Sequence, residues 1–418
     1  MADRAQQHQP AVLFRLRSHP RAAALVVVLA AAIAGGLTVA SGTFDHTQHE
    51  QAARTVYPAP RTENPSHPQS SPARASVAAR LSLAQLAGQR IIYAYVGLTP
   101  PPSLIAQIRA GEAAGVIFFA PNISSPAQLR GVIGQLQRAN ASSPVHAPLL
   151  MLIDQEGGLI RRLPGAPTLS EKQIGATPSG VALAARAGTG AGNNLLAVGI
   201  TVNLAPVVDV FRATGNFIDQ YQRSYSSNPA VVAQLAGTFI TAQQQVGVAA
   251  TAKHFPGLGA ATTSENTDNG PVTLDLPLTE LRSIDEVPYG VAIAAGVKLV
   301  MASWATYPAL DPHFPAGLSS AVIHGELRGR LGFRGVTITD GLGAGALAQY
   351  GGFAQRGVLA AHAGADLLLC STQNVNDNTP ANGIAVRNGL VSALAHNDLS
   401  RTYAEAAAAR VIQLRSNP

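Results

Sequence analysis

Eight short apolar segments, separated by helical stretches, constrain the fold of this chain more than any other feature of its sequence. Each segment is continuously apolar, which is typical of parallel strands that are buried on both faces. The predicted strands are Ile91–Val96, Gly115–Phe119, Leu149–Asp154, Thr201–Val210, Val248–Lys253, Leu299–Trp304, Gly335–Asp340 and Ala365–Cys370. Helical periodicity predicts helices between them, among them Pro126–Arg138, Pro178–Val198, Pro229–Gln245, Leu278–Ala295 and Ser319–Leu331.

Eight strands that are each followed by a helix predict an α/β fold, a (β/α)8 TIM-like barrel that forms one domain over residues 81–418. A doubly wound open sheet is the alternative. In a barrel the catalytic groups lie at the carboxyl ends of the strands. We therefore expect one site to be surrounded by the polar residues at those ends, which are Asp154, Asp209, Lys253, His254, Trp304 and Asp340.

The first 80 residues differ in composition from the predicted barrel. Residues 22–40 carry no charge and follow Arg15, Arg17 and Arg21, a pattern that predicts a cytoplasmic basic tail over residues 1–21 and a transmembrane anchor over residues 22–40. A cleaved signal peptide is the alternative, because Thr38-Val39-Ala40 is an acceptable cleavage site. Residues 41–80 are rich in Pro and Ser and predict a flexible tether. Both interpretations put the barrel outside the cytoplasm, either held at the membrane or secreted.

Charge and motifs argue against several classes of function. The first 80 residues contribute +4 of the net charge of +6, so no basic face in the barrel predicts binding of nucleic acid. The single cysteine, Cys370, excludes disulfides and zinc–thiolate sites, and its apolar surroundings predict a buried, inert thiol. Two glycine-rich stretches, residues 188–193 and 341–346, lack the spacing of a dinucleotide loop. We therefore predict neither a cofactor nor a metal.

The segment Leu152–Leu163, which contains Asp154-Gln155-Glu156-Gly157-Gly158, resembles the signature that follows the third strand of family 3 glycoside hydrolases. The resemblance continues in family order over roughly residues 83–371, and it is greatest to the single-domain β-N-acetylglucosaminidase branch. It is carried further by Asn203–Val210, Arg223–Pro229, Lys253–Gly257, Val300–Ser303, Tyr307–Asp311 and Ile338–Gly343. This resemblance implies a (β/α)8 barrel with retaining exo-glycosidase chemistry on a β-linked glycan. Together with a place outside the cytoplasm, it suggests a muropeptide-like substrate.

The resemblance also implies roles for single residues. Asp340 matches the catalytic nucleophile, whose ionised carboxylate forms a glycosyl-enzyme intermediate; a helix cap is its structural alternative. The residues that match the sugar-binding subsite are Asp154, Arg162, Arg223, Lys253 and His254. Asp209 could bind sugar or accept backbone N–H groups, and Trp304 could stack on a sugar or fill the rim of the barrel.

The loop after Lys253-His254 departs from the family. Members of this branch carry Gly-His-Gly and then Asp-Ser-His, whose Asp–His pair is the acid/base. Here these positions hold Gly257-Leu258-Gly259 and Ser264-Glu265-Asn266, so the expected histidine is absent. Either Glu265 or Asp268 replaces it as a carboxylic acid of raised pKa. The alternatives are a non-catalytic loop, or a carbohydrate-binding protein that lacks an efficient general acid.

Overall fold

Eight parallel strands form the centre of residues 77–418, the part of the chain that the computed structural model describes. They are β1 (Ile91–Tyr93), β2 (Gly115–Phe118), β3 (Leu150–Ile153), β6 (Val202–Asn203), β7 (Ala249–Phe255), β8 (Leu299–Ala302), β11 (Val336–Thr339) and β12 (Leu368–Leu369). Neighbours in the sheet follow the order of the chain, and β1 pairs with β12. A parallel bridge between Ile338 and Leu367 closes the circle. The sheet is therefore the predicted barrel, and the doubly wound alternative is wrong.

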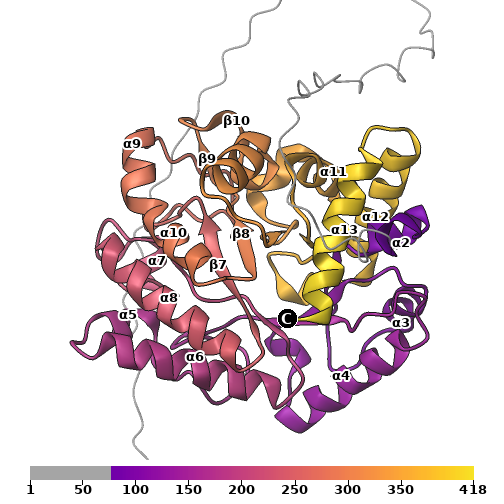
Figure 1. The fold of residues 1–418 in the computed structure, drawn as a ribbon, viewed down its shortest axis with the longest axis horizontal. Coiled ribbons are helices and arrows are strands. Elements are labelled where there is room, and N and C mark those ends of the chain that lie inside the picture. Colours follow the sequence, from indigo (N-terminus) through magenta and orange to yellow (C-terminus); the bar gives the residue numbers. More distant parts are fainter. Residues whose placement is uncertain (1–76) are drawn as a thin grey trace, which may run out of the picture. The chain divides into compact units, whose positions relative to one another are not determined.

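A helix follows each strand and covers the outside of the barrel (Figure 1). Four of the helices begin with a proline at the first helical position, where the missing N–H is harmless. The eight are α3 (Pro102–Arg109), α4 (Pro126–Asn140), α6 (Gly180–Leu196), α8 (Pro229–Gln245), α10 (Val287–Ala294), the π-helix η4 (Ala321–Arg330), α11 (Phe353–Ala363) and α12 (Pro380–Ala395). Two more, α2 (Leu83–Gly88) and α13 (Arg401–Ser416), precede β1 and follow α12.

Several elements are shorter than the sequence pattern predicts. The strand expected over Thr201–Val210 is paired regularly only in β6, Val202–Asn203. Pro206 has no N–H to donate to a ladder, and the chain next meets β7 through a bridge between Val207 and Lys253. The helix expected over Leu278–Ala295 is divided into α9 (Leu278–Glu280), the π-helix η2 (Leu281–Asp285) and α10.

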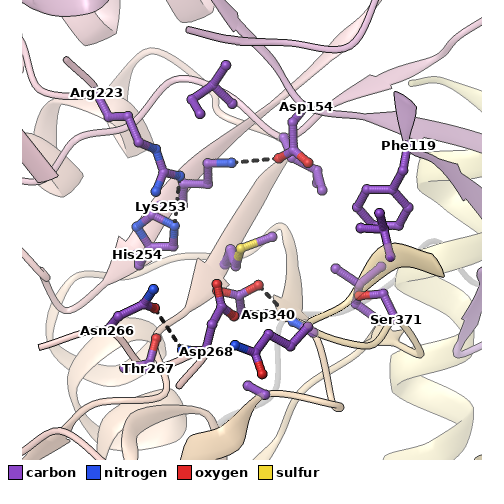
Figure 2. A pocket seen from close by; sticks show the side chains of 18 of the residues that line it. Phe119, Asp154, Arg223, Lys253, His254, Asn266, Thr267, Asp268, Asp340 and Ser371 are labelled. Carbon is purple, nitrogen blue, oxygen red and sulfur yellow. Dashed lines mark hydrogen bonds and ion pairs between the residues drawn. The ribbon is translucent and has the colours of Figure 1, made fainter. Parts of the chain in front are cut away.

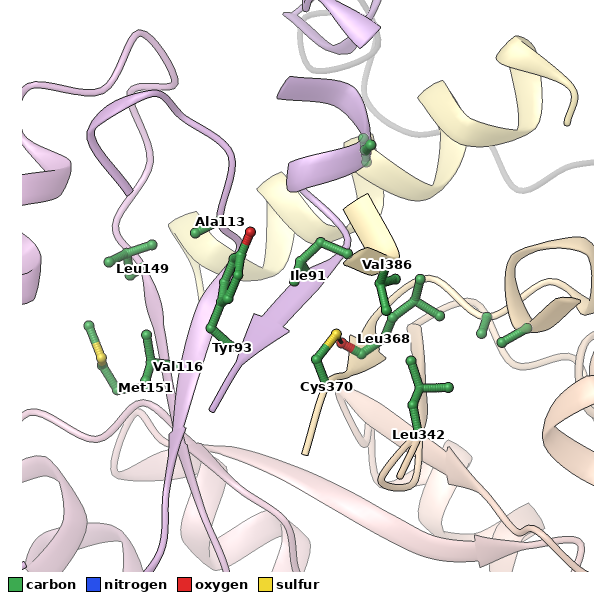
Figure 3. Close-up of a cluster of buried hydrophobic side chains, with 14 of the residues drawn as sticks. Ile91, Tyr93, Ala113, Val116, Leu149, Met151, Leu342, Leu368, Cys370 and Val386 are labelled. Carbon is green, nitrogen blue, oxygen red and sulfur yellow. Dashed lines mark hydrogen bonds between the residues drawn. The ribbon is translucent and has the colours of Figure 1, made fainter. Parts of the chain in front are cut away.

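Alternate residues of the strands build two apolar layers. The barrel interior is filled by side chains such as Ile92, Ile117, Leu152, Met301 and Ile338. Their neighbours point outward and pack against the helices, and Figure 3 shows Tyr93, Met151, Leu368 and Cys370 in this layer with Val386 of α12. Cys370 is fully buried, as predicted, and burial raises the pKa of its thiol. The packed interior leaves the strand ends as the place for a site.

The N-terminal predictions fall almost entirely outside the described residues. These are the basic tail 1–21, the membrane anchor or signal segment 22–40, and the tether 41–80 except for its last four residues. Within residues 77–418 no helix has the length and apolar character needed to cross a membrane.

Candidate active site

A pocket with a volume of about 310 Å³ opens at the carboxyl ends of the strands. Its floor is the apolar interior of the barrel, because Ile117, Leu204, Met301 and Leu369 belong to both. Its walls carry the charged residues from the strand ends and from the loops that follow them (Figure 2). The structure thus brings together Asp154, Arg162, Arg223, Lys253, His254, Asp268 and Asp340, all of them residues that the sequence singled out.

Asp154 stands directly after β3, and a small hairpin follows it. The hairpin consists of β4 (Gln155–Gly157) and β5 (Ile160–Arg161), and it places Glu156 in the same pocket. The buried amide of Gln155 holds the hairpin in shape, since its Oε1 accepts the N–H groups of Arg162 (3.1 Å) and Leu163 (3.0 Å).

Glu156 is a site residue to which the sequence analysis gave no role. Its carboxylate accepts two parallel hydrogen bonds from Arg223 (2.9 Å each), and it lies 2.7 Å from Nζ of Lys253. Burial alone would raise the pKa of Glu156, but the charges and hydrogen bonds of Arg223 and Lys253 outweigh it and lower the pKa to about 2. The one sign of this role in the sequence was the place of Glu156 within the motif that resembles the family signature. Its partners Arg223 and Lys253 lie 67 and 97 positions further along the chain and come close only in the fold.

Lys253 joins Glu156 to Asp154, because its Nζ also donates to Oδ1 of Asp154 at 2.9 Å. Burial raises the pKa of Asp154, but the charges of Lys253 and of Arg162, 4.0 Å away, outweigh it and hold that pKa below its usual value. Arg162 therefore lines the pocket and is not a plain surface charge. Two carboxylates and three cations make a network with donors and acceptors suited to sugar hydroxyl groups.

Lys253 and His254 are consecutive in β7, and both line the pocket. Consecutive side chains of a regular strand point to opposite faces. Here the register of β7 against β8 shifts between Ala252 and Phe255, and this irregularity lets both side chains reach the same site.

Asp209 fixes the orientation of His254. Its fully buried carboxylate accepts the backbone N–H groups of His254 (3.2 Å) and Leu258 (2.7 Å), and it lies 2.8 Å from Nδ1 of the His254 ring. The other ring nitrogen, Nε2, faces the guanidinium of Arg223 at 3.4 Å. Because a guanidinium can only donate, Nε2 accepts and the ring proton lies on Nδ1. Of the two interpretations of Asp209, the structure supports the structural one.

Asp340 directly follows β11 and reaches into the pocket (Figure 2). The N–H of Gly341 donates to its Oδ1 at 2.7 Å and fixes the carboxylate. Trp304 lies behind this turn, where its Nε1 donates to the carbonyl of Gly341 at 3.0 Å. Trp304 is 1% exposed and does not line the pocket, so it fills the rim and does not stack on a ligand.

The two candidate acids of the loop differ in position. Glu265 does not line the pocket, and its Oε2 accepts the N–H of Thr262 at 2.7 Å within the loop. Asp268 lines the pocket and points towards Asp340 (Figure 2). Although the residue as a whole is exposed, desolvation of its carboxyl and the negative charge of Asp340 raise the pKa of Asp268 to about 6. The geometry therefore favours Asp268 over Glu265.

Apolar side chains surround the charged centre of the pocket. Phe119, Ile160, Tyr221 and Val375 line it, and Tyr221 is 43% exposed. No set of three or more His, Cys, Asp or Glu side chains in residues 77–418 is arranged to hold a metal ion. Within this part of the chain the pocket is equipped for a polar organic ligand through hydrogen bonds and carboxyl groups.

Comparison with known proteins agrees with this geometry. The model of the glycosyl hydrolase family 3 N-terminal domain matches residues 95–414. A protein of Arthroderma benhamiae, named an uncharacterized secreted glycosyl hydrolase, is 44% identical over 82% of this chain and 96% of its own length. A beta-hexosaminidase of Nitrosomonas eutropha is 35% identical over 61% of this chain and 72% of its own.

Solved structures give the same result. The family 3 β-N-acetylglucosaminidase of a Paenibacillus species has a TM-score of 0.75 and 34% identity, over 81% of this chain; the match spans 62% of that protein's length. The β-N-acetylhexosaminidase of Beutenbergia cavernae has a TM-score of 0.71 and 30% identity, over 80% of this chain and 98% of its own. With the barrel, the strand-end carboxylates and the family match in agreement, the chain belongs to glycosyl hydrolase family 3 and is a glycoside hydrolase.

Proposed function

We propose that this protein is a retaining exo-β-glycosidase of the β-N-acetylhexosaminidase type. The position of Asp340 carries the proposal: a fixed carboxylate stands at a strand end, in a pocket whose other wall is the network of Asp154, Glu156, Lys253 and Arg223. The pocket ends on the packed barrel interior, so it has room for the end of a glycan and not for a chain passing through. Exo-specificity follows from that shape.

In the proposed reaction the network holds the terminal sugar. The carboxylate of Asp154 accepts hydrogen bonds from sugar hydroxyl groups, while Arg162, Arg223 and Lys253 donate them. His254, whose ring is oriented by Asp209, completes the wall. Asp340 then attacks the anomeric carbon and forms a glycosyl-enzyme ester, which water hydrolyses with net retention of configuration.

The substrate class and the location are part of the same proposal. Relatives named beta-hexosaminidase and β-N-acetylglucosaminidase support a terminal N-acetylhexosamine. The apolar segment at residues 22–40 and the relative named a secreted hydrolase support a place outside the cytoplasm, where cell-wall fragments are available. Whether residues 22–40 are a membrane anchor or a cleaved signal stays a prediction, which N-terminal sequencing of the exported protein tests: a first residue at Ser41 means cleavage.

The experiment is a rate measurement with a panel of aryl β-glycosides. We expect release of the chromophore from aryl N-acetyl-β-glucosaminides, and proton NMR should show the β-anomer as the first product. The Asp340→Asn variant should keep its circular dichroism spectrum and lose turnover, by up to about 10⁶-fold if the loss matches that of a protease deprived of its nucleophile.

The competing function is a carbohydrate-binding protein on a glycosidase fold, which the missing loop histidine favours. It predicts calorimetric binding of sugars without release of chromophore from any aryl glycoside of the panel. That outcome would overturn the enzymatic proposal.

A further inference from the structure

Hydrogen bonds within the loop over residues 262–270 fix the backbone position of Asp268. The side chain of Asn266 accepts the N–H of Asp268 at 2.9 Å, and the carbonyl of Asn266 accepts the N–H groups of Asn269 (3.0 Å) and Gly270 (3.2 Å). On one side the loop is tied to residues 215–220, because the hydroxyl of Thr263 donates to the carbonyl of Gly215 at 2.8 Å.

On its other side the loop is docked to the segment that follows Asp340. The N–H of Gly345 donates to the carbonyl of Asp268 at 2.8 Å, and the N–H of Ala346 donates to the carbonyl of Thr267 at 3.0 Å. The same short segment therefore carries the carboxyl group of Asp340 at its start and holds Asp268 at its end.

Gly345 has no space for a side chain at this contact. A Cβ there would lie 2.6 Å from the carbonyl carbon and oxygen of Asn269 and 2.7 Å from the carbonyl oxygen of Asp268. All three are backbone atoms, which cannot rotate away as a flexible side chain would. Any larger residue at position 345 must therefore displace the loop that carries Asp268 from the segment that follows Asp340.

Asp268 stands outside the ion pairs of the pocket. Asp154 and Glu156 are paired with Lys253, Arg162 and Arg223. Within the described residues Asp268 takes part in no salt bridge, although it lines the same pocket as Asp340. A carboxyl group that forms no ion pair and faces another carboxylate is suited to hold a proton.

We propose that Asp268 is the general acid and base of the glycosidase reaction, in place of the histidine that the loop lacks, and that Gly345 is the positioning residue that docks it beside Asp340. This inference rests on the proposed function and specifies its proton transfers. The raised pKa of Asp268, about 6, is in accord with it.

The proposed reaction has two steps. In the first, the carboxylate of Asp340 bonds to the anomeric carbon, the glycosidic C–O bond breaks, and the proton of Asp268 passes to the leaving oxygen. In the second, water attacks the anomeric carbon, its proton passes to the Asp268 carboxylate, and the ester bond to Asp340 breaks. Both residues return to their starting protonation states.

The test compares two substrates with the same terminal sugar, a nitrophenyl glycoside and a disaccharide, on the full chain. A nitrophenolate leaves without a proton, whereas a sugar hydroxyl needs one. The Asp268→Ala variant should therefore lose about 10²–10⁴-fold in kcat/KM for the disaccharide and less than about tenfold for the nitrophenyl glycoside. Added azide should raise kcat on the nitrophenyl glycoside and give the β-glycosyl azide, because an anionic nucleophile needs no general base.

Gly345→Ala should show the same dependence on the leaving group, with a loss of up to about 10²-fold for the disaccharide, as expected for a misplaced catalytic group. The matched control is Gly270→Ala in the same loop, where a Cβ would meet nothing within 4 Å, and its kinetics should be unchanged. The ratio of kcat/KM between the two substrates is the decisive readout, since partial unfolding lowers both values equally.

Three outcomes overturn the inference while the proposed function stands. They are an equal loss on both substrates in Asp268→Ala, an absence of glycosyl azide, and a leaving-group dependence in Glu265→Gln in place of Asp268→Ala. If the wild-type protein releases no chromophore from any aryl glycoside, the proposed function itself is overturned, and with it the role of Asp268 as the general acid.

Discussion

Nζ of Lys253 lies 2.7 Å from Oε1 of Glu156, and both side chains are almost completely withdrawn from solvent, with exposed fractions of 3% and 2%. Arg223 also donates to this carboxylate, so one buried anion pairs with two cations on the wall of the pocket. Asp154, at the end of β3, pairs with the same ammonium group. The network is thus both a part of the fold and a part of the proposed sugar subsite.

Removing the charge of Glu156 should cost stability. In Glu156→Gln the ammonium of Lys253 and the guanidinium of Arg223 lose their shared anion, and breaking a buried ion pair in this way costs about 3–5 kcal/mol in the free energy of unfolding. Urea denaturation measures it. The matched control is Glu405→Gln, which breaks the exposed pair with Arg401 and should change stability by less than about 1 kcal/mol. Equal effects of the two substitutions would contradict this account.

The same network should make stability fall in acid. The folded-state pKa of Glu156 is about 2 and its ordinary value is 4.5, so unfolding takes up a proton between these values. The stabilising contribution is complete above about pH 4.5 and is lost as the pH falls towards 2. Asp366, whose pKa is also about 2 because Arg410 and Arg328 outweigh its burial, adds to this loss. Denaturation midpoints measured from pH 6 to pH 2.5 should fall less steeply in Glu156→Gln.

Asp209 should act on substrate binding through His254. In Asp209→Asn an NH₂ group replaces one of the carboxylate oxygens that receive the Nδ1–H and the backbone N–H groups of His254 and Leu258. We expect a loss of about 1–3 kcal/mol in stability, because a buried donor loses its acceptor, together with a raised KM as the His254 ring turns. Kinetics well below the unfolding temperature separate the two effects, and an unchanged KM would argue against the positioning role.

The proton carried by Asp268 should determine the alkaline limb of the pH profile. Asp268 must be protonated to serve as the acid, so kcat/KM for a disaccharide should fall about tenfold per pH unit above pH 6. The ionisable groups that act on Asp268 are Asp340 and Asp154, which raise its pKa, and Arg223 and His254, which lower it. In Asp268→Asn this alkaline limb should vanish; a limb that persists there belongs to another group.

The sequence by itself determined the fold and the location of the site. Continuous apolar segments are what strands buried on both faces require, and strands of one direction bring their carboxyl ends to one edge. Residues at those ends, such as Asp154, Lys253 and Asp340, could therefore be placed in one pocket without coordinates. The family resemblance was read from the same residues.

Only the tertiary structure decided which polar groups meet. Glu156 acquires its role from Arg223 and Lys253. Asp268 differs from Glu265 by its backbone contact with Gly345, a residue 77 positions further along the chain. Trp304 stands at a strand end as a sugar-stacking residue would, yet its indole is buried under Gly341. Periodicity determines which face of an element is apolar. The direction of a side chain in a loop, and hence its charge partners, depends on backbone contacts between segments far apart in the sequence, and these exist only once the barrel has closed.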